Sequence, residues 1–277
     1  MRKSRDYVSR FPEQTQEWLN GRPVEEVECI IADFVGMSRG KAMPGATFNR
    51  LERTFLPLSV FYQTVSGEYV TMGIENQWTE ADMVLTPDYS TAVAAPWSND
   101  VVIQVIHDVS DLAGAPIGLV PRNVLKRVMA LYKENGWTPV VAPEIEFYLT
   151  KPNLDPAKPA MGRTGRRVVS RQAYSMMAVD DYGPVIDDIY DYAEAMGLEI
   201  DTIIQEGGAG QIEINLVHGD PVRLADQVFF FKRLIREAAL KNECFATFMA
   251  KPMQDEPGSA MHIHQSVLDD QGDNVFN

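Results

Sequence analysis

The chain has 277 residues, 45% of them hydrophobic, which is enough for the core of one large or two medium domains. Its net charge of −14 argues against nucleic acid or an anionic membrane as the main partner. No apolar run approaches the ~18 residues of a membrane span, and none follows the basic start 1–7, so we expect no signal peptide. Cys29 and Cys244 lie far apart outside any C-x-x-C pattern, as expected for free thiols of a cytoplasmic protein.

The first part of the chain predicts a small sheet with a helix. Short apolar runs bounded by turn-forming residues predict strands at 27–35, 38–43, 82–88 and 101–109. Pro12 and Gly21 bound a predicted helix over 12–21, and Thr47 is a suitable N-cap for a second helix to about Leu56. The turn-rich segment 110–120 is the best boundary, so we predict one α+β domain over 1–113 and a second domain over 114–277.

The second part of the chain alternates strands and helices. Apolar residues at helical spacing predict helices at 121–136, 184–196 and 221–242. Further strands are expected at 140–149, 198–205, 211–217, 245–250 and 260–267. The segment 151–171 has three prolines and four arginines, and we predict a solvated loop there rather than a phosphate site.

Acids and histidines recur in three short segments of this second part: Glu144, Glu146, Glu206, Glu213, His262 and His264. Successive side chains of a strand point to opposite faces, so Glu144 and Glu146 share a face, as do the two histidines. Carboxylates on one wall repel one another unless cations neutralise them, and oxygen ligands with an imidazole suit Mg²⁺ or Mn²⁺. Each pair alone also occurs on solvated strands or in hydrogen-bonded cores. The three segments together predict a metal-dependent enzyme.

These segments resemble the glutamine synthetase family. Glu144-x-Glu146, the element Glu206-Gly-Gly-Ala-Gly-Gln-x-Glu213 and the element Gly258-Ser-Ala-Met-His-x-His-x-Ser266 occur in the family's order and approximate spacing. The segments 33–41 and 82–88 look like parts of its small N-terminal β-grasp domain. The resemblance covers nearly the whole chain. It implies an α+β protein with a β-grasp domain over 1–113, then a catalytic domain built as a curved antiparallel sheet, or half-barrel, with flanking helices.

The resemblance implies an ATP-dependent ligase that joins the γ-carboxylate of glutamate to ammonia or an amine through a γ-glutamyl phosphate. It also implies two or more Mg²⁺ or Mn²⁺ ions per site, and a homo-oligomer of two stacked hexameric rings. Phosphoryl transfer needs positioning and charge neutralisation more than covalent help, which agrees with a site rich in metal ligands. No nucleic acid or membrane partner is expected.

The resemblance further assigns roles to individual residues. Five side chains are implied to be metal ligands, with one ion on Glu146, Glu206 and Glu213 and another on Glu144 and His262. His264 and Ser266 are implied to lie near the ATP phosphates, and the Gly258 backbone near the amino-acid substrate. No catalytic residue is assigned within the chain.

Two departures from the family pattern qualify this prediction. Segment 64–70 lacks the Asp-Gly-Ser-Ser element whose aspartate helps to deprotonate ammonium. The step from Glu206 to Glu213, followed by Glu-Ile-Asn-Leu, looks more like the γ-glutamylpolyamine synthetase branch, so a primary amine or polyamine is at least as well supported as ammonia. The chain also stops at Asn277, whereas family members continue through phosphate-binding arginines, a loop with a catalytic glutamate and a last metal ligand.

We therefore expect a catalytic domain that is incomplete at its C-terminus, in a fragment of a longer protein. Two alternatives stay open. The first is a truncated, non-catalytic paralogue that joins a related ring as a passive subunit. The second is a metal-dependent hydrolase, because His-x-His with a carboxylate can also bind zinc and activate water.

Overall fold

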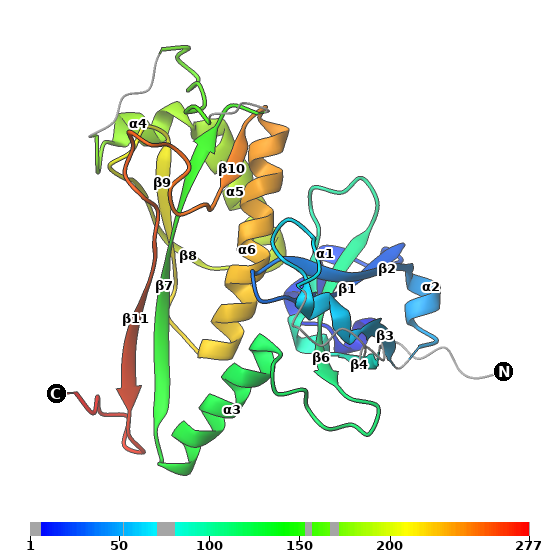
Figure 1. Cartoon of the computed structure of the whole chain (residues 1–277). Coiled ribbons are helices and arrows are strands. Elements are labelled where there is room, and N and C mark those ends of the chain that lie inside the picture. Colours follow the sequence, from blue (N-terminus) through cyan, green and yellow to red (C-terminus); the bar gives the residue numbers. More distant parts are fainter. Residues whose placement is uncertain (1–6, 52, 71–80, 153–156, 167–171, 277) are drawn as a thin grey trace. The chain divides into compact units, whose positions relative to one another are not determined.

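The computed structural model describes residues 7–51, 53–70, 81–152, 157–166 and 172–276. They form two compact units that divide between Asn135 and Gly136, and each unit is built on its own β-sheet (Figure 1). No helix among the described residues is long and apolar enough to cross a bilayer.

The first unit contains a mixed sheet in the order β2-β1-β6-β4-β3, with β5 also paired to β6. Its described strands are β1 (Glu26–Ala32), β2 (Ser38–Pro44), β3 (Thr54–Pro57), β4 (Asp82–Pro87), β5 (Val93–Ala94) and β6 (Val102–Ser110). β1 runs parallel to β6, whereas β1 and β2 form an antiparallel hairpin. The predicted hairpin and the predicted strands at 82–88 and 101–109 are confirmed.

The helices of this unit are α1 (Glu13–Leu19), α2 (Gly45–Phe48) and α3 (Pro121–Glu134), with short 3₁₀ turns at Val8–Arg10, Leu58–Tyr62 and Tyr89–Thr91. The predictions of α1 and α3 are confirmed, and α1 ends at a left-handed Asn20. The predicted helix from Thr47 to Leu56 is wrong. It stops after one turn because Thr54 and Leu56 bury their side chains on alternate positions of β3, which pairs with β4.

Two apolar clusters pack within this unit. Val27, Cys29 and Ile103 belong to the cluster that also contains Leu19 of α1, and Ile31 belongs to the other. Cys29 and Ile31, two positions apart on β1, therefore contribute to different clusters. Burial raises the pKa of Cys29 to about 12, although Lys41 acts in the opposite direction. Both cysteines are buried and free, which confirms the prediction of free thiols.

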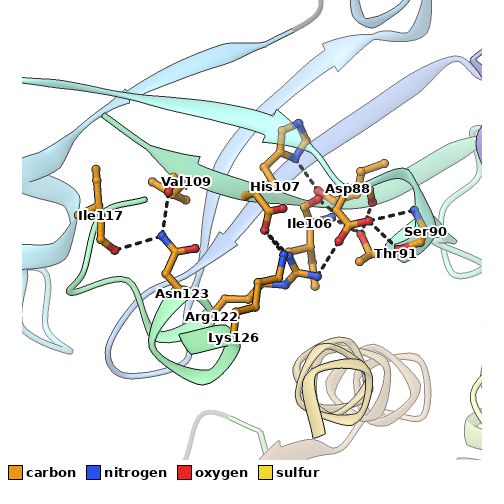
Figure 2. Close-up of polar contacts among 12 residues, drawn as sticks. Asp88, Ser90, Thr91, Ile106, His107, Val109, Ile117, Arg122, Asn123 and Lys126 are labelled. Atoms are coloured by element: carbon orange, nitrogen blue, oxygen red, sulfur yellow. Dashed lines mark hydrogen bonds and ion pairs between the residues drawn. The ribbon is translucent and has the colours of Figure 1, made fainter. Parts of the chain in front are cut away.

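Helix α3 is held to the first unit by a network of charges and amides. Arg122 donates to Asp88 at 2.8 Å and also to Asp108, and Lys126 donates to Asp108 at 2.6 Å (Figure 2). The buried amide of Asn123 donates to the carbonyls of Val109 and Ile117. These contacts explain why the compact units divide after α3. The division at 113/114 stays a prediction as a domain boundary.

The second unit is built on an antiparallel sheet in the order β10-β7-β9-β8. Its described strands are β7 (Thr138–Thr150), β8 (Ile200–Gln205), β9 (Gln211–Leu216), β10 (Phe245–Thr247) and β11 (Met261–Leu268). The 13 residues of β7 are long enough for β10 and β11 to pair with successive stretches of one edge, while β9 pairs with the other. Figure 1 shows β11, in red, beside β7, in green. All five predicted strands are confirmed.

The helices of this unit are α4 (Met176–Asp181), α5 (Gly183–Met196) and α6 (Pro221–Lys241). The sequence predicts α5 and α6 but not the short α4. Ile145 and Phe147 of β7 and Ile212 and Ile214 of β9 are buried, as are apolar residues of α5 and α6. One face of the sheet therefore belongs to the core, and alternate residues of the same strands are left to form the other face.

Candidate active site

The face of the second sheet opposite the core carries the predicted acids and imidazoles. Glu146 of β7 lies directly opposite Glu213 of β9. Glu144 lies opposite Asn215 on one side and opposite His262 of β11 on the other. Directly opposite residues of antiparallel strands project to the same face. The register thus brings side chains from three strands onto one polar wall, although His262 is more than a hundred residues from Glu144 in the chain.

Negative charge on neighbouring carboxylates acts on Glu213. The side chain of Glu213 is buried, at 7% exposure. Burial raises its pKa, and the charges of Glu144, Glu206 and Glu146 raise it further. Glu206, at the end of β8, thus lies within electrostatic range of Glu213. The strand register places Glu144, Glu146 and Glu213 on one face of the sheet, and their roles as metal ligands stay a prediction.

The histidines flank Glu144. Nε2 of His264 lies 2.8 Å from Glu144 Oε1, and Nδ1 of His262 lies 3.4 Å from Glu144 Oε2. The side chain of His262 is 65% exposed and that of His264 is 70% exposed, whereas the Glu144 side chain is 24% exposed. Ser266 lies further along β11, opposite Val140, and is half-buried. The register therefore places Ser266 at some distance along the strand from the carboxylates.

The loop between β8 and β9 approaches the sheet so closely that it requires glycine. A Cβ on Gly208 would lie 2.0 Å from the hydroxyl of Tyr148. Gly210 has a φ of +76°, and a Cβ there would lie 2.8 Å from the hydroxyl of Tyr182. This close approach holds the acids at the two ends of the loop beside β7.

Gln211 connects the carboxylate wall to the loop that contains Gly258. Its side-chain nitrogen donates to Glu146 at 3.0 Å and to the Gly258 carbonyl at 2.9 Å. Its side-chain oxygen accepts from the Gly208 amide at 2.9 Å. The hydroxyl of Tyr148 donates to the Pro257 carbonyl at 2.7 Å. Gln211 therefore bridges two predicted site residues by hydrogen bonds: Gly258, predicted to lie near the amino-acid substrate, and Glu146, a predicted metal ligand.

Sequence reasoning missed Gln211, Tyr148 and Glu256. Burial, then the charges of Glu256, Glu146 and Glu206, raise the pKa of Tyr148. Tyr148 and Gln211 each lie two residues from a predicted ligand on the same strand, so the two-residue period was a usable signal. Glu256 lies in a loop and accepts from the Ala209 amide at 2.9 Å. No local pattern could have indicated it.

The polar wall has the chemistry of a divalent-cation site. Its donors are carboxylate oxygens with imidazole, which suit Mg²⁺ or Mn²⁺. Burial raises the pKa of Glu213, and negative charge that a cation would neutralise raises it further. Within the described part of the chain, no three His, Cys, Asp or Glu side chains are already gathered as a metal-binding cluster. Glu144 and Glu146 are instead engaged by His264 and Gln211.

Comparison with known protein families decides the relationship. The family model for the glutamine synthetase catalytic domain matches residues 118–277, more than half of the chain. The chain belongs to the glutamine synthetase family. The predicted family is therefore confirmed, and the acidic wall lies within the part of the chain that matches the synthetase catalytic domain.

Among the similar proteins of this glutamine synthetase family, γ-glutamylputrescine synthetase PuuA of Escherichia coli K12 is 33% identical over 276 residues. A glutamate–isopropylamine ligase of a Pseudomonas species is 30% identical over 270 residues. The alignments cover 97% and 95% of this chain and 58% of each relative. The chain thus spans somewhat more than half the length of these synthetase relatives.

Solved structures show the same fold. The structure described as "GmaS/ADP complex-Conformation 1" matches with a TM-score of 0.76 at 24% identity, over 94% of this chain and 57% of that one. A novel glutamine synthase homolog matches with a TM-score of 0.78 at 21% identity, over 92% of this chain and 57% of that one. The chain has the sheet-rich α/β fold of the glutamine synthetase catalytic domain. The β-grasp assignment of its N-terminal domain stays a prediction.

Proposed function

We propose that the protein containing this chain is an ATP-dependent glutamate–amine ligase. It phosphorylates the γ-carboxylate of glutamate, and an amine then displaces the phosphate to form a γ-glutamyl amide. The observation that carries the proposal is the placement of Glu144, Glu146 and Glu213 on one face of the sheet beside two imidazoles. Crowded carboxylates of this kind suit divalent cations, and phosphoryl transfer depends on such cations for charge neutralisation.

In this proposal Glu146, Glu206 and Glu213 hold one Mg²⁺ or Mn²⁺ ion, and Glu144 and His262 hold another. When bound, these ions neutralise charge on the transferred phosphoryl group. The shared side-chain nitrogen of Gln211 orients Glu146 and the Gly258 loop together, because it donates to both. A movement of the loop that contains Gly258 would therefore also move the Glu146 carboxylate.

His264 and Ser266 are proposed to face the ATP phosphates, and the backbone of Gly258 the glutamate substrate. His264 shares a face and a strand with Ser266. In the structure its imidazole contacts Glu144, so it can move a proton or donate a hydrogen bond at the edge of the carboxylate wall. Both histidines are exposed enough to contact a bound substrate.

The acceptor is proposed to be a primary amine or polyamine rather than ammonia. Two relatives are named for putrescine and isopropylamine as their amine partners. Segment 64–70 also lacks the Asp-Gly-Ser-Ser element expected of enzymes that use ammonium. A cytoplasmic location and a dodecamer of two hexameric rings complete the proposal.

The test uses the full product of the gene with Mg²⁺, ATP and glutamate. We expect ADP release that requires both glutamate and an amine, with a higher kcat/KM for putrescine or isopropylamine than for ammonia. The Glu213→Gln variant is the control, because it removes one carboxylate charge while keeping the side-chain volume. The proposal would be overturned in favour of a hydrolase if ADP release did not depend on the amine, or if tightly bound zinc supported hydrolysis.

A further inference from the structure

Three potential donor groups form a row across three neighbouring strands. His262 on β11, Glu144 on β7 and Asn215 on β9 are consecutive cross-strand partners. Directly opposite residues in antiparallel strands have Cβ atoms about 4.5–5.5 Å apart and share a face. The proposed function uses His262 and Glu144 as ligands of one cation. Asn215 completes the same row and has no role in that proposal.

The side-chain oxygen of Asn215 lacks a partner. Asn215 lies two residues from Glu213 on β9, so the two side chains share a face of the sheet. The Oδ1 atom of Asn215 is buried without a hydrogen-bond partner among the described residues. Buried acceptors are rarely left unsatisfied in native proteins. An asparagine with a purely structural role would place its oxygen against a donor.

We infer that the Asn215 side-chain oxygen is a ligand of the divalent cation that Glu144 and His262 hold. This inference rests on the proposed function. Amide oxygens are ordinary ligands of Mg²⁺ and of other hard divalent ions. A row of imidazole, carboxylate and amide supplies three donors from three rigid strands.

The charge of the wall explains why this position carries an amide. The charges of three other carboxylates already act on Glu213, so a further acid would add like-charge repulsion whenever the site is empty. A neutral oxygen adds a ligand without that repulsion.

The experiment measures binding of Mn²⁺ alone by titration calorimetry, without ATP or glutamate. Asn215→Leu should weaken the affected Mn²⁺ site by about tenfold, a loss of the size seen when groups that support a metal are removed. Asn215→Asp restores an oxygen at the same place and should bind at least as tightly as the wild type. Gln265→Leu is the matched control, because it removes an amide from β11 at an alternate position, on the opposite face. It should leave the affinity unchanged.

A double-mutant cycle identifies which ion is affected. In the background of His262→Ala, Asn215→Leu should cause little additional loss, because both side chains serve the same cation. Unchanged Mn²⁺ affinity in Asn215→Leu would overturn the inference while leaving the proposed function standing. The inference would also be overturned if the loss of Mn²⁺ affinity in the double variant equalled the product of the two single-variant losses. If the wild-type protein itself binds no Mn²⁺, the proposed function fails, and the inference fails with it.

Discussion

The two units of this chain treat buried negative charge in opposite ways. In the first unit Asp88 and Asp108 each contact a basic side chain of α3 (Figure 2). Burial alone would raise the pKa of Asp88, but hydrogen bonds from Ser90 and Arg122 and nearby positive charge lower it. In the second unit the pKa of Glu213 is raised, because this side chain is buried and the charges that act on it are other carboxylates.

The comparison separates a structural use of charge from a functional one. The acids beside α3 are neutralised within the chain, so they hold a helix in place and need nothing else. Within the described ranges, the acids of the wall are contacted by imidazoles and amides. In the proposed function a divalent cation from outside neutralises them.

The strongest way to break this comparison is Glu213→Gln in the complete protein. We expect kcat/KM for amine-dependent ADP release to fall by at least ~100-fold, equivalent to about 2.7 kcal/mol of transition-state stabilisation. Without metal the variant should melt at the same temperature or higher, because one repelling charge is gone. The comparison fails if activity stays within tenfold of the wild type, since the wall would then be structural as well.

Removing a charge from the ion pairs between α3 and Asp88 and Asp108 should instead destabilise the first unit. Arg122→Met leaves Asp88 half-buried without its guanidinium, and we expect a loss of about 2–3 kcal/mol in the free energy of unfolding. Lys126→Met is the control: its side chain is 38% exposed, and exposed pairs contribute about 0–1 kcal/mol. Urea unfolding of both variants gives the comparison. Equal losses would show that exposure does not decide the strength of these pairs.

His107 sharpens the contrast, because it is a buried base beside the same network. It is 2% exposed, and burial lowers its pKa to about 4, even though Val105, Asp108 and Asp88 favour the charged form. The folded protein therefore keeps His107 neutral, while the unfolded chain takes up a proton as the pH falls below about 6.5.

Stability should thus fall as the pH drops from about 6.5 towards 4. The share due to His107 is about 1.8 kcal/mol between pH 7 and pH 5. His107→Gln should lose that part of the pH dependence, measured as the difference between urea unfolding curves of the two proteins. If wild type and variant change in parallel over this range, His107 does not remain neutral in the folded state.

The smallest expected effect is stabilisation by the cation itself. At ten times its dissociation constant, Mn²⁺ should stabilise the wild-type protein by about 1.4 kcal/mol. Glu146→Gln should lose most of this gain, whereas Arg122→Met should keep it, because its network already carries its own cations. Thermal melting with and without Mn²⁺ measures both. A loss in Arg122→Met would show that the metal effect is not specific to the wall.

Several features could be predicted because their signals are local. Pro12 and Asn20-Gly21 bound α1, and Gly197 ends α5 in the left-handed conformation that favours glycine. Alternation of apolar and polar residues indicated each strand of the second sheet. The same alternation indicated that Glu144 and Glu146 share a face. The order and spacing of the acidic and histidine segments were enough to predict the family.

Other features depend on contacts between residues far apart in the chain. Segment 54–57 is a strand only because β4 lies beside it, and α3 belongs to the first unit because Asp88 and Asp108 pair with its basic residues. The register of β7, β9 and β11 places Asn215 and His262 on either side of Glu144. The sequence by itself determined most of the longer helices and strands, the positions of the acids and histidines along the chain, and the family. Only the tertiary structure decided which donors face one another, because strand register is set by packing across the whole sheet rather than by neighbours along the chain.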